Sequence, residues 1–232
     1  MVSVATQIIL TNPFFYLILL ATCAVVWYIK QRKRPELQLV FEKIGIPPKH
    51  SLLKKEWTSA AKLEKTIQRL IRKQYTFLTP KKLNSSAPEK SVLLVFVGGY
   101  RSFYTHVFPL LEKHKIPATL LLAPDLIGTY NSWQDPHQEP WQDLLTLAEV
   151  NELKKSPLIY WGALPLSCLN ITACSQEQAV FAIKESIYRL EHQLGISPCA
   201  WSTYPALKIT PDVISSLTQL GIKLPLVPLQ EK

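Results

Sequence analysis

The stretch SVLLVFVGG, residues 91–99, decides the fold class. Six apolar residues in a row follow Ser91 and end at two glycines. A short apolar run that is bounded by a turn signal indicates a strand buried on both faces, as in a parallel sheet. The two glycines predict a tight turn at the carboxyl end of this strand.

Helix-like and strand-like segments alternate around this central run. The 3.6-residue spacing of apolar residues predicts helices at 59–75, 102–115, 141–155, 175–195 and 210–221. Short apolar runs predict further strands at 75–79, 116–124, 157–164 and 198–205. Ser175 with Gln178 forms a capping-box pattern at the start of the longest helix. Such alternation is typical of an α/β sheet or barrel with parallel strands.

The composition excludes several classes of protein. The chain has 232 residues, of which 47% are hydrophobic, so it can bury a core without disulfides and is neither disordered nor collagen-like. The formal net charge of +9 is concentrated in residues 30–90, which hold 16 Lys or Arg against 5 Asp or Glu. There is no helix-turn-helix, zinc-finger or RNP pattern, so we expect no nucleic-acid partner.

The N-terminal run IILTNPFFYLILLATCAVVWYI, residues 8–29, carries no charge and is long enough to cross a bilayer. Basic residues follow it at Lys30 and at 32–34, whereas a signal peptide carries them before its apolar core. We therefore predict an uncleaved single-pass anchor over 1–30 that contacts membrane lipid, with a buried helix of a soluble protein as the alternative. We further expect a basic connector and lead-in over 31–58, and a folded domain over 59–232.

The segment SVLLVFVGGYRSFYTHVFPLLEKHKIPATLLL, residues 91–122, resembles the polysaccharide deacetylase (NodB-homology) family. The resemblance is closest to the poly-N-acetylglucosamine deacetylase branch, and it extends in weaker pieces over 36–232. It implies a distorted (β/α) barrel of the polysaccharide-deacetylase type, here preceded by one transmembrane helix. It also implies metal-assisted amide hydrolysis, in which one Asp is the general base while a second Asp and two histidines hold a zinc-type ion.

This chain departs from the family pattern at each of those positions. Val97 stands at the base position and Gly98 at the metal-binding Asp position. The two histidine positions fall on Leu164 and on Cys168, or on Leu169 if the spacing is one residue longer. A single thiolate does not make a metal site. We therefore predict no catalytic residues, no bound metal and no other cofactor, with zinc or a similar divalent ion expected only if a divergent site exists.

Other polar groups offer no clear replacement for that site. His106 and His114 lie on a predicted helix, where solvated histidines are common. Asp135, His137 and Glu139 alternate in a loop and are expected to face water. The thiols of Cys168 and Cys174 lack partner histidines and are expected to be buried.

Aromatic residues at predicted strand ends suggest a sugar groove on the functional rim of such a barrel. Their flat faces suit the apolar faces of sugars, although a role in the core is the competing interpretation. The candidates are Tyr100, Trp133, Trp141, Trp161, Trp201 and Tyr204.

The resulting hypothesis is a membrane-anchored, polysaccharide-deacetylase-like pseudoenzyme that binds carbohydrate or acts as a scaffold. Its expected partner is an N-acetylglucosamine polymer or another protein. One alternative is an active carbohydrate N-deacetylase, a hydrolase of non-peptide C–N bonds, that uses a divergent site. A second alternative is a structural membrane protein that binds a protein partner. The positive-inside rule places the domain in the cytoplasm, whereas analogy with the family places it outside the cytoplasm.

Overall fold

The computed structural model describes residues 37–82, 87–88, 90–166, 175–202 and 211–219. The chain divides into a first unit, 1–35, and a second unit, 36–232, and all described residues belong to the second. The predicted membrane anchor over 1–30 lies outside the described residues, as do Cys168, Leu169, Cys174 and Tyr204. Within the described ranges, no helix is long and apolar enough to cross a membrane.

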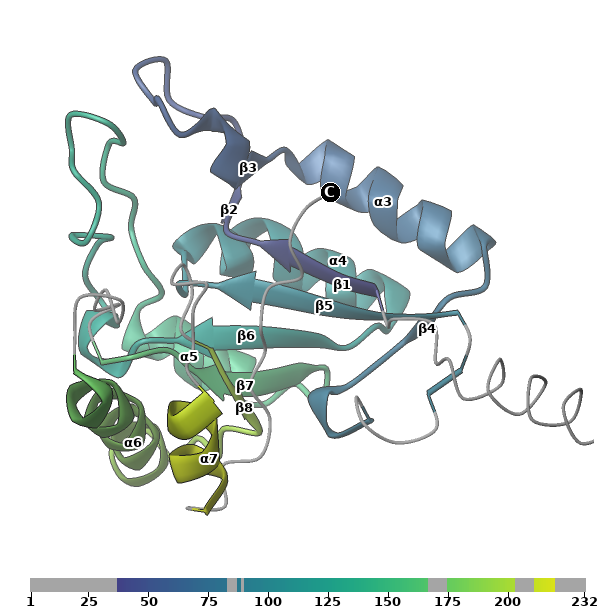
Figure 1. Ribbon diagram of the computed structural model, residues 1–232. Coiled ribbons are helices and arrows are strands. Elements are labelled where there is room, and N and C mark those ends of the chain that lie inside the picture. Colours follow the sequence, from purple (N-terminus) through teal and green to yellow (C-terminus); the bar gives the residue numbers. More distant parts are fainter. Residues whose placement is uncertain (1–36, 83–86, 89, 167–174, 203–210, 220–232) are drawn as a thin grey trace, which may run out of the picture. The chain divides into compact units, whose positions relative to one another are not determined.

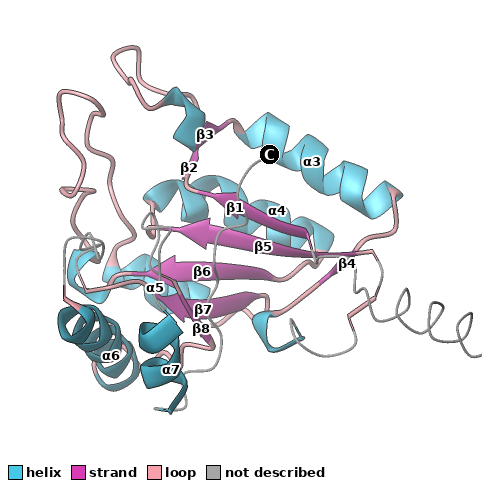
Figure 2. Ribbon diagram, viewed as in Figure 1, coloured by secondary structure: helices cyan, strands magenta, loops and turns pink. Residues whose placement is uncertain are grey.

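The predicted strand at 91–97 belongs to a six-stranded sheet within the described part of the chain and pairs with three of its other strands. Every residue of this strand, β5 (Ser91–Val97), is buried. The strand order is β1-β5-β6-β7-β8, with β4 also paired to β5, and all pairs are parallel. Figure 2 shows the arrowheads of the long strands pointing the same way. The other strands of the sheet are β1 (Leu37–Phe41), β4 (Thr76–Phe77), β6 (Ala118–Leu122), β7 (Ile159–Ala163) and β8 (Ala200–Trp201).

Helices alternate with these strands, as the sequence predicted, so the structure confirms a parallel α/β fold that forms a half-barrel. Figure 1 shows α3 near β1 and the pair α6 and α7 near β8. The helices are α3 (Ala60–Arg72), the π-helical turn η3 (Phe103–Val107), α4 (Phe108–His114), α5 (Leu147–Leu153), α6 (Gln176–His192) and α7 (Pro211–Gln219). Three short 3₁₀ turns complete the set: η1 (Lys54–Glu56), η2 (Pro80–Lys82) and η4 (Pro124–Leu126).

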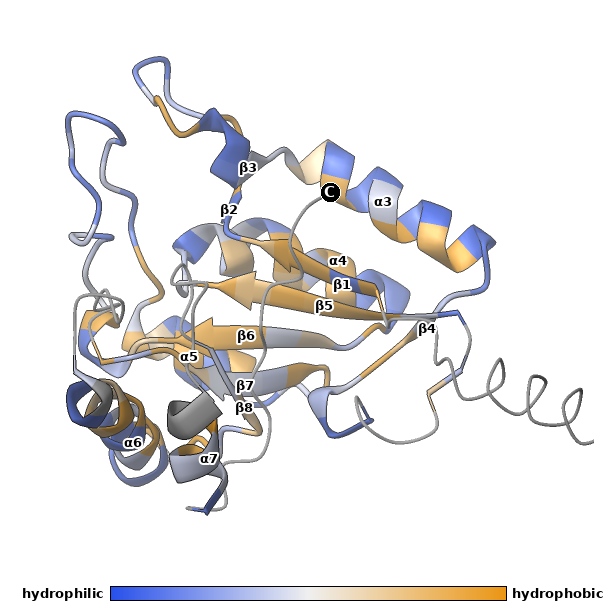
Figure 3. Ribbon diagram, viewed as in Figure 1, coloured by the Kyte–Doolittle hydropathy of each residue, from blue (hydrophilic) through white to orange (hydrophobic). Residues whose placement is uncertain are grey.

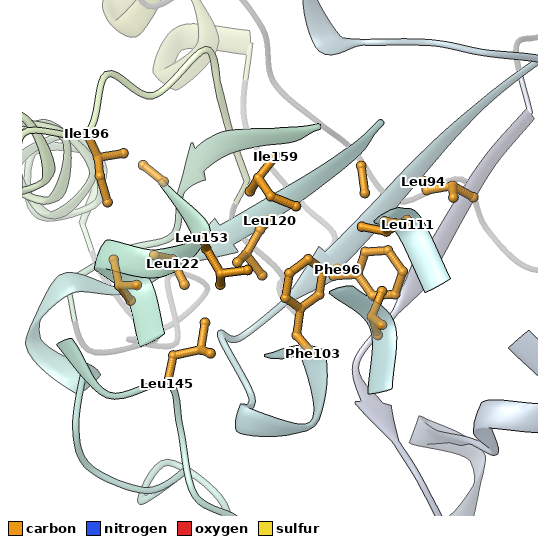
Figure 4. Close-up of a cluster of buried hydrophobic side chains, with 14 of the residues drawn as sticks. Leu94, Phe96, Phe103, Leu111, Leu120, Leu122, Leu145, Leu153, Ile159 and Ile196 are labelled. Carbon is orange, nitrogen blue, oxygen red and sulfur yellow. The ribbon is translucent and has the colours of Figure 1, made fainter. Parts of the chain in front are cut away.

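Side chains of β5 alternate between two separate apolar clusters, because successive residues of a strand point to opposite faces. Val92, Leu94 and Phe96 join the cluster under the helices, which we call the helix-side core. The intervening residues 93, 95 and 97 join a second cluster, which we call the inner cluster. Figure 3 shows that the ribbon of β5 and β6 is mainly coloured as hydrophobic, whereas α3 alternates between hydrophilic and hydrophobic residues. Figure 4 shows Phe96, Phe103 and Leu120 pointing toward one another in the helix-side core.

Local signals in the sequence account for most helix boundaries. Ser175 accepts a hydrogen bond from the Gln178 backbone and the Gln178 side chain returns one, which confirms the predicted capping box. The predicted helix at 102–115 is interrupted, because Pro109 has no N–H to donate and the preceding turn opens into a π-helix. The predicted helix at 141–155 begins only at Leu147, since Leu144 and Asp143 form extended bridges with Tyr100 and Tyr130.

The described part of the predicted connector belongs to the folded unit. Residues 37–41 form β1 and pair with β5 at five successive positions. Two shorter strands, β2 (Lys43–Ile44) and β3 (Trp57–Thr58), pair with each other in parallel. The strand β1 is only partly buried and lies within a basic segment. For this reason the apolar pattern of these five residues does not by itself predict a strand, since charged residues surround it and two prolines follow at 47–48.

Replacement of Phe96 by alanine tests the helix-side core. The Phe96 ring stacks on Phe41 at 5.2 Å and meets Phe103 edge-on at 5.1 Å between centroids. We expect Phe96→Ala to lower the free energy of unfolding by about 3–5 kcal/mol, because it removes these contacts and leaves a cavity. The same change at Phe181, which is 63% exposed, is the control and should alter stability by less than about 0.5 kcal/mol. If urea unfolding showed the same loss of stability for both variants, the result would contradict the packing of Phe96 in this core.

Candidate functional site

The carboxyl ends of β5 and β7 bring together two positions that the sequence analysis singled out. Val97 and Leu164 both lie in the inner cluster, with 5% and 0% of their surfaces exposed. The Leu164 backbone N–H donates to the Leu122 carbonyl at 2.8 Å, which extends the pairing of β7 with β6 by one residue. The structure therefore places Val97 and Leu164 in one apolar cluster, where neither side chain offers a proton acceptor or a metal ligand.

The ring of Tyr100 occupies the space beside Gly98. A Cβ atom at Gly98 would lie 2.8 Å from Tyr100 Cε2 and 3.7 Å from Trp133 Cζ2. The turn here is left-handed, with φ values of +91° at Gly98 and +67° at Gly99, which confirms the predicted tight turn. An aspartate at position 98 would meet both this backbone strain and the Tyr100 ring.

The zinc-type ion of the family does not fit the described residues at these positions. Neither a valine, a glycine nor a leucine supplies a nitrogen, oxygen or sulfur side-chain ligand. Among the residues that the structure describes, no three His, Cys, Asp or Glu side chains gather closely enough to hold a metal ion. The last position expected from the resemblance, Cys168 or Leu169, lies outside those residues.

The polar residues of the 128–140 loop do not form a joint site either. Asp135 Oδ1 accepts a hydrogen bond from the His137 backbone at 2.9 Å, which is a turn contact. Glu139, in contrast, is fully buried, although the sequence analysis expected it to face water. Its carboxylate accepts hydrogen bonds from Trp57 Nε1 at 2.8 Å and from the Ser51 hydroxyl. The burial is possible because these donors satisfy the charge that water would otherwise solvate.

A buried lysine completes a charge network that the sequence analysis missed. Lys43 is only 1% exposed, and its Nζ lies 2.7 Å from Glu56 Oε2 and 3.4 Å from Glu139 Oε1. Gln134 Nε2 donates to Glu56 Oε2 at 2.9 Å. The network joins β2 and η1 to the 128–142 loop, segments that are far apart in sequence. No local pattern marks such a lysine as buried, because its partners come from elsewhere in the fold.

The five candidate aromatic residues that the structure describes do not line one groove. Trp201 is fully buried in the helix-side core and Trp161 packs against the same core, whereas Tyr100 and Trp133 belong to the inner cluster. Trp141 is 46% exposed and stacks on Tyr130 with 4.4 Å between ring centroids. The expectation of a single groove overlooked that neighbouring residues at a strand end point to opposite faces of the sheet. The groove prediction does not hold for Trp201, because the Trp201 ring is fully buried and has no face open to a ligand.

A cleft of about 360 Å³ opens beside Tyr100, between the β2–β3 pair and η3. Arg101 is held at its edge, because its backbone N–H donates to the Asp143 carbonyl and its Nε donates to Glu149 Oε1, at 2.9 and 2.8 Å. The hydrogen bond to Glu149 raises the pKa of Arg101. Burial favours a higher pKa for Glu149, but hydrogen bonds from Thr146 and Arg101 outweigh it, so the pKa of Glu149 is lowered. The lining residues are Lys43, Ile44, Gly45, Ile46, Trp57, Tyr100, Arg101, Ser102, Thr105, His106, Gln142 and Asp143.

Comparison with known proteins identifies the family. The polysaccharide deacetylase family model matches residues 84–225, more than half of the chain. This chain belongs to the polysaccharide deacetylase family. The resemblance stated from the sequence is thereby confirmed.

Individual relatives agree with this membership. The poly-β-1,6-N-acetyl-D-glucosamine N-deacetylase of Escherichia coli K12 is 37% identical over 79 residues, which cover 31% of this chain but only 11% of that protein. Among solved structures, IcaB from Ammonifex degensii superposes with a TM-score of 0.66 at 19% identity, over 82% of this chain and 83% of IcaB. The deacetylase PplD from Streptococcus pyogenes superposes with a TM-score of 0.65 at 16% identity, over 83% of this chain and 92% of PplD. At these identities the superpositions show a shared fold.

Introducing a carboxylate at the base position tests whether the inner cluster is as apolar as the packing indicates. We expect Val97→Asp to lower the free energy of unfolding at pH 8 by at least about 3 kcal/mol, because it buries an unpaired charge. Val97→Asn is the matched uncharged control and should cost less.

The pH dependence separates charge from shape in this test. Burial would raise the folded-state pKa of an aspartate at position 97, so the folded variant would bind its proton more tightly than the unfolded chain. The stability gap between the two variants should therefore narrow as pH falls from 8 toward about 4. If the Asp and Asn variants are equally stable at pH 8 in urea unfolding, the aspartate charge must be reached by water or paired with another group, and the cluster is not as apolar as the packing indicates.

Proposed function

We propose that this chain is a carbohydrate-binding or scaffolding member of the polysaccharide deacetylase family that does not carry out metal-assisted N-deacetylation. The observation that carries the proposal is the apolar inner cluster, which holds both Val97 and Leu164, while Tyr100 covers Gly98. These are the positions at which the family resemblance calls for a base and metal ligands.

Amide hydrolysis needs a general base and a group that stabilises the developing negative charge. A positioned general base contributes about 10²- to 10⁴-fold in rate, and a metal ion stabilises the developing charge by several kcal/mol. A valine and a glycine can supply neither contribution. A neighbour could replace one missing group, but the inner cluster holds apolar side chains and the nearby carboxylates of Glu56 and Glu139 are already paired with Lys43.

The ligand class follows from the relatives. The matching E. coli protein is named for poly-β-1,6-N-acetyl-D-glucosamine, although this chain spans about a tenth of its length. We propose an N-acetylglucosamine polymer as the ligand, because part of this chain matches that protein in sequence and the chain shares the fold of solved deacetylases. A protein partner bound in place of sugar is the competing outcome.

Metal content and acetate release, measured on the purified full chain, test the loss of catalysis. We expect no stoichiometric zinc and no acetate release from N-acetylglucosamine oligosaccharides, because the motif positions hold no ligands. An active member of the family assayed in parallel is the positive control. Stoichiometric zinc together with acetate release would overturn the proposal and favour an active N-deacetylase with a divergent site.

We also propose that residues 1–30 anchor the chain in a membrane, with the domain on the cytoplasmic side. Support comes from the uncharged run at 8–29 and the basic cluster at 30–34 that follows it. A reporter fused to the C-terminus should give a cytoplasmic signal in membrane fractions. Reversing the charges at 32–34 is the control that should weaken this orientation, and a clear extracytoplasmic signal from the unaltered chain would refute it.

A further inference from the structure

We propose that the cleft between β2–β3 and η3 is the carbohydrate site and that it holds an uncharged, N-acetylated glucosamine oligosaccharide. This inference rests on the proposed function and gives it a location away from the carboxyl ends of β7 and β8. Tyr100 is shared between the two regions, because its ring covers Gly98 and also lines the cleft. The volume of about 360 Å³ lies within the usual range for small-molecule sites.

The charges around the cleft argue against an anionic ligand. Lys43 lies within 4 Å of two carboxylates, those of Glu56 and Glu139. Arg101 is likewise paired with two, at 2.8 Å from Glu149 and 3.9 Å from Asp143. Two cations thus face four carboxylates. A phosphate, sulfate or uronate group would find no uncompensated lysine or arginine among the residues that line the cleft, whereas an uncharged ligand needs no such partner.

The polar side of the cleft suits hydroxyl and amide groups. The Asp143 side chain is 76% exposed and its long contact with Arg101 leaves acceptor capacity for a sugar hydroxyl. The Arg101 side chain is 50% exposed, and its bond to Glu149 uses Nε, so the outer nitrogens of the guanidinium can donate to a carbonyl or hydroxyl oxygen. Because Glu149 already holds the guanidinium in place, little side-chain freedom is lost on binding.

The other side of the cleft is apolar. Ile46 is 87% exposed and Trp57 is half-buried, and both line the cleft. Glu139 fixes the Trp57 ring through its Nε1–H at 2.8 Å. An aromatic ring and an aliphatic side chain suit the apolar face of a pyranose and the methyl group of an acetamide. A ligand with both hydroxyls and acetyl groups therefore matches both sides, which a purely polar sugar does not.

The buried network of Lys43 supplies the support for this site. Lys43 Nζ lies 5.6 Å from the centre of the Tyr100 ring and 5.9 Å from that of Trp57. Of its carboxylate partners, Glu139 ties Trp57 to the 128–142 loop and Glu56 accepts a hydrogen bond from Gln134 in the same loop, which leads to Asp143. The network thus positions the walls of the cleft.

Binding of a β-1,6-linked N-acetylglucosamine tetramer to the full chain in detergent, followed by calorimetry, tests the inference. We expect Asp143→Ala and Ile46→Ser each to weaken binding by about 5- to 10-fold, since each removes one contact of about 1 kcal/mol. The matched controls are Asp135→Ala in the same loop as Asp143 and Leu52→Ser, which is 73% exposed outside the cleft. Both controls should bind within about twofold of the unaltered chain. Thermal melting verifies that all four variants fold.

The outcomes separate the site from the proposed function. If all four variants bind the tetramer as tightly as the unaltered chain, the cleft is not the carbohydrate site, although the chain still binds carbohydrate. No binding by the unaltered chain would overturn both. A uronate tetramer of equal length is the anionic comparison, and it should bind at least about 10-fold more weakly. Equal or tighter binding of the uronate would refute the argument from charge.

Discussion

The burial of β5 on both faces is the constraint on which the rest of the structure depends. A strand that is apolar along its whole length must be covered twice, and the chain does this with a helix-side core on one face and the inner cluster on the other. The same alternation sends Phe96 toward the helices and Val97 toward the interior. Because neighbouring residues of the strand point to opposite faces, the register of β5 determines which of its side chains reach the inner cluster at the carboxyl end of the sheet.

That end of the sheet is where a metal-dependent deacetylase would need its polar groups, and here it is packed. The backbone brings Val97 and Leu164 into one cluster, and the turn at Gly98 is left-handed. Neither of the two side chains offers a proton acceptor or a metal ligand, and Tyr100 fills the space that a longer side chain at Gly98 would need. Polar groups are concentrated instead in the neighbouring cleft, where each described cation is matched by carboxylates.

Much of the fold could be predicted because its signals are local. The run at 91–97 and the capping box at Ser175 each act within a few residues, and both appear in the structure as expected. The strand β1 and the late start of α5 were missed. Both depend on pairing with distant segments, β1 with β5 and residues 143–144 with the region of Tyr100 and Tyr130.

Local patterns in the sequence are sufficient to predict the α/β class and the order of most elements, and the sequence also shows that positions 97, 98 and 164 carry no acidic or histidine side chain. Only the tertiary structure decided that Glu139 and Lys43 are buried together, that the aromatic residues divide between two clusters, and that a cleft opens beside Tyr100. The physical reason is that burial of a charge depends on partners from remote segments. The side of a sheet on which a residue lies, moreover, depends on a register that pairing alone establishes.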